Sequence, residues 1–559
     1  MSGHSKEYKV LNAEFERIVK HYLVNSSSVK STHNTRNKTP ELEIRFGTNP
    51  KQAKPISFID YQNVVNHLLL NGWTTFDVEG MQMLRIIPQR FTGDIPKPLD
   101  KPQEEKQDQE EKQDQEEKQD QEETVVNGGH GNKNKMIMSN IRAEIMGTDL
   151  IQEYCEHNDL EKMKKNTYIS QQRIKFTKKS KVFDETTKEV LPIVDFQDFN
   201  FRVAYMEEEE YPLHSTYMPI KKMLYDWNNS KKTFRSINRV RFKHESYPVF
   251  VDISIVKTNR KHIVRKTGQK KPLPTETIQE SDAFNMPPVY EIELEFDNTD
   301  TVRYSNESMF PEYMQKIRTC IRTILAGLQG TPYPISYSEQ ELVLHAYMCR
   351  MYGDSWLQTK SPEPHYIGPS SVPLKMENII PSSEKNILTQ YTVTEKADGD
   401  RALLYVSNEG KIYLITYNLK VIFTGSRTKE KRCFNSLLDG ELIMYGKAPE
   451  KRKLFLFAAF DIYYFGGMEK DAHVRPLSFI TSDDTELEDK YRLPLLEKFH
   501  KFLEMETITE NPLCSFQMRC KKFQFCDNET TSIFQACNNI WGNKDYYDYE
   551  VDGLIFTPM

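Results

Sequence analysis

Two stretches that lie far apart in the chain alternate strictly between charged and hydrophobic residues. Residues 39–47 read TPELEIRFG, and residues 288–296 read PVYEIELEF. Successive side chains of a β-strand point to opposite faces, so each stretch predicts a strand with one charged face and one apolar face. A single strand of this kind is typical of an ordinary sheet with one face in water. The neighbouring strands therefore decide whether the charged faces meet solvent or an enclosed interior.

About eight strand-like stretches, with few helices between them, make up the N-terminal part of the chain. Together they favour a closed antiparallel barrel or a sandwich. If every apolar face packs outward against helices, the charged faces line the inside of a barrel, with carboxylates at one place and basic residues around them. The polar residues on these faces are Glu41, Glu43 and Arg45; Arg142 and Glu144; Arg173 and Lys175; Asn200 and Arg202; Arg239, Arg241 and Lys243; and Glu291, Glu293 and Glu295.

Such an interior suits a chain of phosphates held together with a metal ion. Clustered carboxylates repel one another, and they persist where a divalent cation neutralises them. Mg²⁺ and Mn²⁺ prefer oxygen ligands. Arginine grips a phosphate group with two parallel hydrogen bonds. The combination fits phosphoryl transfer to water.

A lysine motif in the C-terminal part predicts a different chemistry. TEKADGDRALLYV contains the pattern K-x-D-G-x-R, from Lys396 to Arg401. A simple alternative is a hairpin turn, for which Asp-Gly is a common signal. Three more motifs follow in order, however: LLDGEL, FAAFDIYY and YEVDGLIFTP. A lysine amine attacks the α-phosphate of a nucleotide only when it is unprotonated, so burial or neighbouring cations must lower its pKa.

These motifs resemble those of two known families. ExExR near the N-terminus, a distant ExExE strand and the basic strands between them look like the triphosphate tunnel metalloenzymes, over about residues 38–300. That family comprises RNA 5′-triphosphatases and relatives with an eight-stranded tunnel. The four motifs from Lys396 onward resemble the covalent nucleotidyltransferases, over about residues 365–559. The order of the two parts is similar to that in the mRNA capping enzymes of large DNA viruses.

The first resemblance implies roles for the charged residues of the tunnel. It implies that Mg²⁺ or Mn²⁺ is held by Glu41, Glu43, Glu291 and Glu293. Glu295 would bind the metal or orient the attacking water, and Asp252 matches an acidic position of the family. Phosphates would be held by Arg173, Lys175, Arg239 and Arg241.

The second resemblance implies a nucleotide site around Lys396, which would form a lysyl–GMP intermediate. Asp439 lies in the second of the four motifs. The other nucleotide-binding residues would be Arg401 and Glu441 at the sugar, Phe460 against the base and Asp552 at the metal. The motifs alone do not decide between GTP and ATP. The fusion favours GTP, because a triphosphatase leaves the diphosphate end that a guanylyltransferase needs.

The expected fold class is α+β, with an eight-stranded antiparallel tunnel followed by a nucleotidyltransferase domain of antiparallel sheets and flanking helices. We assign residues 1–335 to the first domain and residues 360–559 to the second. Residues 104–121 are three copies of EEKQDQ. With almost no apolar residues such a segment cannot offset its ordering entropy, so residues 97–135 are predicted to be a disordered surface insertion.

The chain carries neither the apolar core of a signal peptide nor a run near the roughly 20 apolar residues that cross a bilayer. An intracellular, soluble protein is therefore expected, in the virion or host cytoplasm by resemblance. The formal net charge of −6 argues against a lysine-coated, non-specific binder of nucleic acid.

The expected function is mRNA 5′ capping, with removal of the RNA 5′ γ-phosphate and then transfer of GMP from GTP. The expected partners are an RNA 5′-triphosphate end, GTP, and a methyltransferase domain or subunit. The chain stops after DGLIFTP, before the lysine pair and OB-fold that follow in the family, so weak or absent guanylylation of Lys396 is expected. An ATP-dependent RNA repair ligase with a polyphosphatase domain and an inactive scaffold subunit are the alternatives.

Overall fold

The structure is a computed structural model, and it forms two compact units, Met1–Leu328 and Gln329–Met559. It describes residues 2–29, 38–47, 55–76, 81–91, 136–163, 172–184, 187–263, 270–299, 301–304, 306–353, 356, 363–449, 453–466, 490–507, 515–525 and 532–559. The predicted disordered insertion at residues 97–135 lies outside the described residues. No helix within these ranges is long and apolar enough to cross a membrane.

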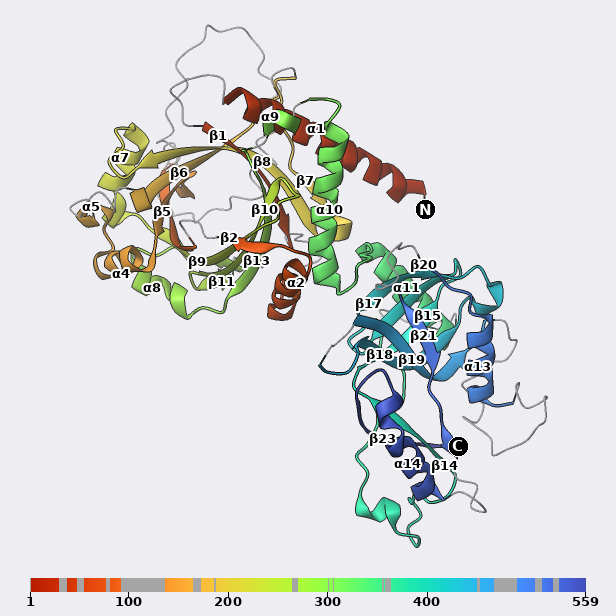
Figure 1. The fold of residues 1–559 in the computed structure, drawn as a ribbon. Coiled ribbons are helices and arrows are strands. Elements are labelled where there is room, and N and C mark those ends of the chain that lie inside the picture. Colours follow the sequence, from red (N-terminus) through yellow and green to blue (C-terminus); the bar gives the residue numbers. More distant parts are fainter. Residues whose placement is uncertain are drawn as a thin grey trace. The chain divides into compact units, whose positions relative to one another are not determined.

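Eight antiparallel strands of the first unit close into a barrel, seen end-on in Figure 1. The strands around the ring are β9 (Lys232–Lys243), β10 (Val249–Thr258), β13 (Val289–Phe296), β1 (Lys38–Phe46), β8 (Phe201–Pro212), β6 (Ile174–Lys181), β5 (Ile141–Met146) and β3 (Gln82–Phe91). Pairing of β3 with β9 closes the ring. The predicted eight-stranded antiparallel barrel is confirmed.

Short elements extend this ring. Strand β2 (Thr74–Phe76) continues the wall along β9, β4 (Met136–Met138) pairs with β3, and β7 (Val194–Phe196) pairs with β8. The other short elements are α5 (Leu160–Met163), η2 (Gln197–Phe199), η3 (Trp227–Asn229), β11 (Lys261–Ile263), β12 (Lys270–Pro272), α8 (Ile278–Ser281), η4 (Ala283–Asn285) and α9 (Thr301–Tyr304).

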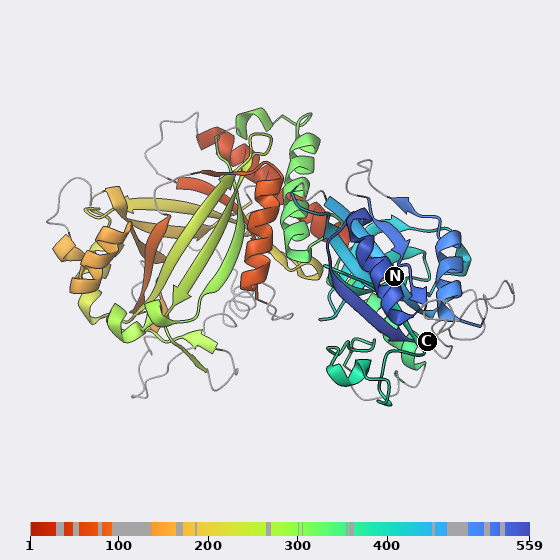
Figure 2. The ribbon, with the colours of Figure 1, turned by 60° about the horizontal axis from the view of Figure 1, so that its bottom comes forward.

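Helices cover the apolar outer faces of the strands (Figures 1 and 2). Helices α1 (Ser2–Val29), α2 (Phe58–Leu70) and α10 (Phe310–Gln329) pack on β1, β10 and β13 in one core. Helices α4 (Thr148–His157) and α7 (Met218–Tyr225) pack on β3, β5 and β6 in another. A capping box of Ser57 and Asp60 fixes where α2 begins. Because most apolar residues of these strands face outward, the alternating charged residues face the lumen. A small apolar cluster on the lumen side consists of Met83, Met146, Ile237 and Val256.

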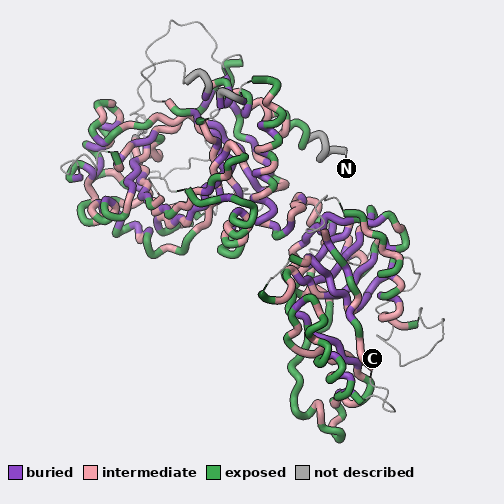
Figure 3. The backbone as a smooth tube through the Cα atoms, in the orientation of Figure 1, coloured by how far each residue is buried: buried purple, intermediate pink, exposed green. Residues whose placement is uncertain are grey.

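A seven-stranded sheet forms the core of the second unit, and its strands are largely buried (Figure 3). Its strand order is β20 (Glu506–Thr507), β17 (Val421–Arg427), β16 (Lys411–Thr416), β15 (Asp400–Val406), β18 (Leu437–Tyr445), β19 (Lys453–Tyr464) and β21 (Gln517–Cys520). Helix α13 (Arg492–Phe502) packs on one face, and α11 (Tyr337–Tyr352) packs on the other.

A smaller sheet of the second unit carries the predicted lysine motif. It consists of β22 (Gln524–Phe525), β14 (Tyr391–Ala397) and β23 (Val551–Pro558), with α14 (Ile533–Gly542) packed against it. Two residues, 398 and 399, connect β14 to β15, so the motif joins the two sheets. Short 3₁₀ turns complete the unit: η5 (Met376–Ile379), η6 (Lys431–Cys433) and η10 (Lys544–Tyr546).

The outward packing of the barrel strands can be tested with two leucines. Leu294 of β13 is fully buried beneath the helices, whereas Leu70 at the end of α2 is 77% exposed. Leu294→Ala leaves a cavity and should lower the free energy of unfolding by about 3 kcal/mol. Leu70→Ala should change it by less than about 0.5 kcal/mol. Chemical denaturation measures both, and equal effects would contradict the outward orientation of Leu294.

Candidate active sites

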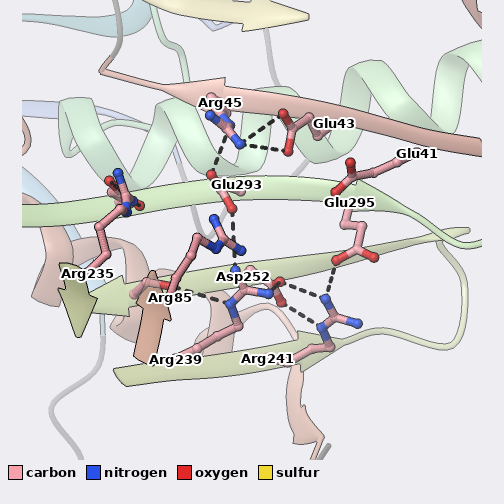
Figure 4. Close-up of polar contacts among 12 residues, drawn as sticks. Glu41, Glu43, Arg45, Arg85, Arg235, Arg239, Arg241, Asp252, Glu293 and Glu295 are labelled. Atoms are coloured by element: carbon pink, nitrogen blue, oxygen red, sulfur yellow. Dashed lines mark hydrogen bonds and ion pairs between the residues drawn. The ribbon is translucent and has the colours of Figure 1, made fainter. Parts of the chain in front are cut away.

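Carboxylates from three neighbouring strands meet in the lumen of the barrel. The register of β1 and β13 places Glu43 opposite Glu295 and Arg45 opposite Glu293. On the other edge of β13, Asp252 of β10 lies opposite Glu293. Directly opposed side chains of antiparallel strands share one face, and Figure 4 shows these groups facing the same space. Strand pairing therefore brings together acidic residues about 250 positions apart in the chain.

Guanidinium groups lie between these carboxylates. The Arg45 Nη2 and Nε atoms are each 2.9 Å from a carboxylate oxygen, of Glu43 and Glu293 respectively. Arg239 and Arg241 of β9 reach the buried Asp252 at 2.8 and 2.7 Å. Arg241 also pairs with Glu295 (Figure 4). Every carboxylate of this group thus has a basic partner in the structure.

A second group of charges lines the wall formed by β3, β5, β6 and β8. Glu144 accepts hydrogen bonds from Arg85 at 3.0 Å and Arg142 at 2.7 Å. Glu208 pairs with Arg142 at 2.9 Å and with Lys179 at 3.0 Å. Lys179 also pairs with Glu41 of β1, so this wall is linked to the carboxylates of β1.

Three of these residues, Arg85, Lys179 and Glu208, were not predicted at all, whereas Arg142 and Glu144 were predicted to face the lumen but were given no role. Lys179 follows Lys175 by four positions on the same strand, so the alternation of β6 could have revealed it. Glu208 lies in a run of four glutamates at 207–210, where both faces of the strand carry the same residue type. Alternation gives no signal in such a run.

Burial and crowding shift the pKa values of the lumen carboxylates in both directions. Burial is the main cause that raises the pKa of Glu41 to about 8, against the opposing effect of Lys179. Burial likewise raises the pKa of Glu295 to about 7, against Arg241. Burial also disfavours the charge on Glu144, but Arg85 and Arg142 outweigh it and lower its pKa to about 2. Negative charge is therefore least well compensated at Glu41 and Glu295.

Three of the predicted tunnel residues, Glu291, Arg173 and Lys175, pair with side chains outside the two groups described above. Glu291 lies two residues before Glu293 on β13 and accepts hydrogen bonds from Arg235 at 2.8 and 2.9 Å. The other two are Arg173, which pairs with Asp149, and Lys175, which pairs with Glu210. No group of three or more Asp, Glu, His or Cys side chains in the described ranges is placed to hold a metal ion. The predicted metal ligands therefore remain a prediction.

In the second unit, Lys396 lies against Asp552. Antiparallel pairing of β14 with β23 sets Lys396 opposite Gly553, the neighbour of Asp552. The Lys396 Nζ donates to both carboxylate oxygens of Asp552, at 2.8 and 2.7 Å. Both side chains are about half exposed, at 48% and 49%. The first and last of the four motifs thus form one accessible ion pair.

A more rigid contact lies beside this pair. The Arg401 guanidinium donates two hydrogen bonds to the fully buried Asp439, at 3.1 and 2.5 Å. The hydroxyl of Tyr463 donates to the same carboxylate at 2.5 Å. The Arg401 guanidinium carbon also lies 5.7 Å from the centre of the Phe460 ring. The structure therefore brings three of the predicted nucleotide-binding residues together.

Lys521 belongs to this group, although it was not predicted. Its side chain is fully buried, and its Nζ lies 3.1 Å from Glu441 and donates to the Glu395 carbonyl oxygen at 3.2 Å. It also lies 5.7 Å from the centre of the Phe460 ring. Burial raises the pKa of Glu441, and Lys521 opposes this shift. The segment RCKKFQF shows no alternation that distinguishes Lys521 from its neighbour.

The charged lumen of the barrel and the lysine site of the second unit place the chain among proteins that combine a charged β-barrel with a nucleotidyltransferase-type domain. Residues 336–559 match the family model of the mRNA capping enzyme, catalytic domain. The capping enzyme family model thus matches almost the whole of the second unit, and the resemblance to capping enzymes predicted from the sequence is confirmed.

A curated relative is named the probable mRNA-capping enzyme of Acanthamoeba polyphaga mimivirus. The two are 25% identical over 307 residues, which cover 49% of this chain and 23% of the relative. The chain thus spans about a quarter of the length of that relative.

Two solved structures are similar to this chain. One is the triphosphatase of the mimivirus capping enzyme, with 12% identity and a TM-score of 0.25, over 54% of this chain and 94% of the other. The second is the S. pombe Pct1 RNA triphosphatase, with 10% identity and a TM-score of 0.25, over 56% and 90%. Superpositions this loose are too weak to support a fold, so the barrel rests on its strand pairing.

The role of Lys521 in the second unit can be tested against its neighbour. Lys521→Ala would leave Glu441 mostly buried without its closest cation, which should lower the free energy of unfolding by about 3 kcal/mol. Lys522 is exposed, so Lys522→Ala is the matched control and should have little effect. Chemical denaturation followed by circular dichroism measures both. Equal stability of the two variants would contradict a structural role for the ion pair between Lys521 and Glu441.

Proposed function

We propose that this chain acts at the 5′ end of messenger RNA in two steps. In the first unit, water displaces the γ-phosphate of an RNA 5′-triphosphate end. In the second unit, Lys396 takes up GMP from GTP and passes it to the resulting diphosphate end. The observation that carries this proposal is the lumen itself, where Glu43 faces Glu295 beside the guanidinium groups of β9. The match of residues 336–559 to the capping enzyme catalytic domain supports the second step.

The lumen carboxylates have the donor chemistry of a Mg²⁺ or Mn²⁺ site. Glu43 and Glu295 oppose each other, and Glu41 is the next lumen-facing residue on β1, so we assign the metal first to these three. Glu293 lies beside them, whereas Glu291 is held by Arg235. A bound metal would neutralise phosphate charge and polarise the scissile bond. The chemistry of the donors supports the fit of Mg²⁺ or Mn²⁺ to this site, because hard cations select carboxylate oxygens.

Basic residues of the lumen would bind the phosphates themselves. Arg239 and Arg241 lie within ion-pair distance of the carboxylates, so they can contact the same phosphate groups that a metal would contact. Asp252 holds both arginines in place. Arg173 and Lys175 would act at a greater distance, where a longer phosphate chain or the RNA backbone passes.

In the second unit the reactive atom is the Lys396 Nζ. Its ammonium must lose a proton and its contact with Asp552 before it can attack. The new bond joins Nζ to the α-phosphorus, and pyrophosphate leaves as the α–β phosphoanhydride bond breaks. The RNA diphosphate then attacks the same phosphorus, and the bond to Nζ breaks. The base would stack on Phe460, whose ring centre lies 5.7 Å from both the Arg401 guanidinium carbon and the Lys521 Nζ.

The tunnel assignment predicts a selective loss of phosphate release. Glu43→Gln or Glu295→Gln removes charge stabilisation worth several kcal/mol and should slow release from 5′-triphosphate RNA roughly 100-fold or more. Glu207 lies on the outer face of β8, where it pairs with Lys38, so Glu207→Gln is the matched control. Phosphate release is measured with Mg²⁺ or Mn²⁺ present. Unchanged release from both lumen variants would remove the assignment.

The nucleotide site predicts a covalent label on one lysine. Incubation with GTP labelled at the α-phosphate should label the wild-type chain and the Lys522→Ala control only weakly, as expected from the sequence, and should leave Lys396→Ala unlabelled. Strong label on the wild type that is lost in Lys396→Ala would contradict the expected weak guanylylation. Glu43→Gln should still be labelled, because its change lies in the other unit. Label from ATP and none from GTP would identify a ligase-type enzyme instead.

A further inference from the structure

Four side chains form a cluster at one end of the β2–β9–β10 wall: Phe76, Arg241, Lys243 and Phe250. Of these, only Arg241 has a role in the chemistry proposed above. The register pairs Phe76 with Arg241 across β2 and β9, and Lys243 with Phe250 across β9 and β10. Directly opposed side chains share a face, and so do residues two apart on one strand. Arg241 faces the lumen, where it holds Asp252 and Glu295. All four side chains therefore lie on the lumen face.

The two rings of this cluster lie side by side. Their centroids are 5.9 Å apart and their planes differ by 21°, which is a stacked arrangement. The Lys243 Nζ lies 5.6 Å from the centre of Phe76 and 5.8 Å from that of Phe250. The Arg241 guanidinium carbon lies 4.9 Å from the centre of Phe250. Aromatic faces and cations thus alternate within one small area.

Core packing does not account for these rings. Phe76 is 41% exposed, and Lys243 is exposed as well. Among the described residues, neither ring belongs to the apolar clusters that hold the barrel to its helices. An exposed phenylalanine on the charged face of a barrel loses the benefit of burial, so a ligand that covers it would restore that benefit.

We propose that Phe76 and Phe250, with Lys243, form a stacking platform for the first nucleobase of the RNA. The proposal rests on the triphosphatase function proposed above. Bases stack on aromatic side chains with little dependence on sequence, because every base has a flat π-face. Arg241 touches both the Phe250 ring and the Glu295 carboxylate, so it connects the platform directly to the phosphate site. A nucleotide whose phosphates lie at Arg241 has its own base within reach of the rings.

A purely structural role for the rings makes a different prediction. If Phe250 only shields the pairing of Arg241 with Glu295, loss of its ring should weaken the binding of any triphosphate end, with or without a base. If the rings bind a base, their loss should matter only when a base is present. The two roles are therefore separated by comparing RNA ends that differ in the base alone.

The experiment uses the full chain and two short RNAs labelled with fluorescein at the 3′ end. Both carry a 5′-(β,γ-methylene)triphosphate, which cannot be hydrolysed, and the second lacks the base of its first nucleotide. Fluorescence anisotropy measures the dissociation constants. The wild-type chain should bind the base-bearing RNA roughly tenfold more tightly than the abasic RNA.

Substitutions at Phe76 then locate the effect. Phe76→Leu keeps an apolar side chain but no ring, and it should bind both RNAs with the affinity that the wild type shows for the abasic one. Phe76→Tyr keeps the ring and should keep the tenfold preference. Equal binding of the two RNAs by the wild type would overturn the platform, and so would a preference that survives in both Phe76→Leu and Phe250→Leu.

This binding assay does not depend on catalysis. Phosphate release from an ordinary 5′-triphosphate RNA tests the proposed function in a separate measurement. If the chain prefers the base-bearing RNA but releases no phosphate, the stacking platform is supported and the triphosphatase function is contradicted. A chain that releases phosphate equally fast from base-bearing and abasic RNA at low substrate concentration would keep the triphosphatase and lose the platform.

Discussion

Compensation of charge inside a closed barrel is the constraint on which the first unit depends. Closing the ring through β3 and β9 limits the contact of the carboxylates of β1 and β13 with water, so that the Glu43 side chain is 10% exposed and the Glu295 side chain 35%. An unpaired carboxylate in that position is costly, and removing one partner of a buried pair costs several kcal/mol. The guanidinium groups of Arg45, Arg239 and Arg241 therefore stabilise the barrel as well as the candidate site. Function and folding place the same demand on these side chains.

Alternation could be predicted because it is a local property of each strand. The outward packing of Leu294 and the inward position of Glu295 both follow from a period of two residues. Alternation alone did not decide between a closed barrel and a sandwich. Closure depends on the pairing of β3 with β9, which lie on either side of residues 92–135 in the chain. For the same reason, the sequence could not show that Glu295 lies opposite Glu43 while Glu291 lies beside Arg235.

The second unit shows the same limit in another form. The order of four motifs predicted a nucleotide site, yet the contact of Lys396 with Asp552 comes from the pairing of β14 with β23 across 156 positions. Lys521 could not be predicted, because a lysine in an irregular segment gives the same signal whether it is buried or exposed. Its burial depends on Glu441 of another strand, which supplies the opposite charge.

The ion pairs of the candidate sites differ in how readily they exchange partners. Asp439 is fully buried and accepts three hydrogen bonds, so Arg401 is held in one place. Lys396 and Asp552 are half exposed and are bound only to each other among the contacts described, so their separation costs little. In the lumen, Asp252 keeps Arg239 as a partner when Arg241 turns to a phosphate, whereas Glu295 then needs another positive partner at the same moment. Phosphate and a divalent cation therefore favour each other in this barrel, because either one alone would leave like charges facing at short range in a poorly solvated space.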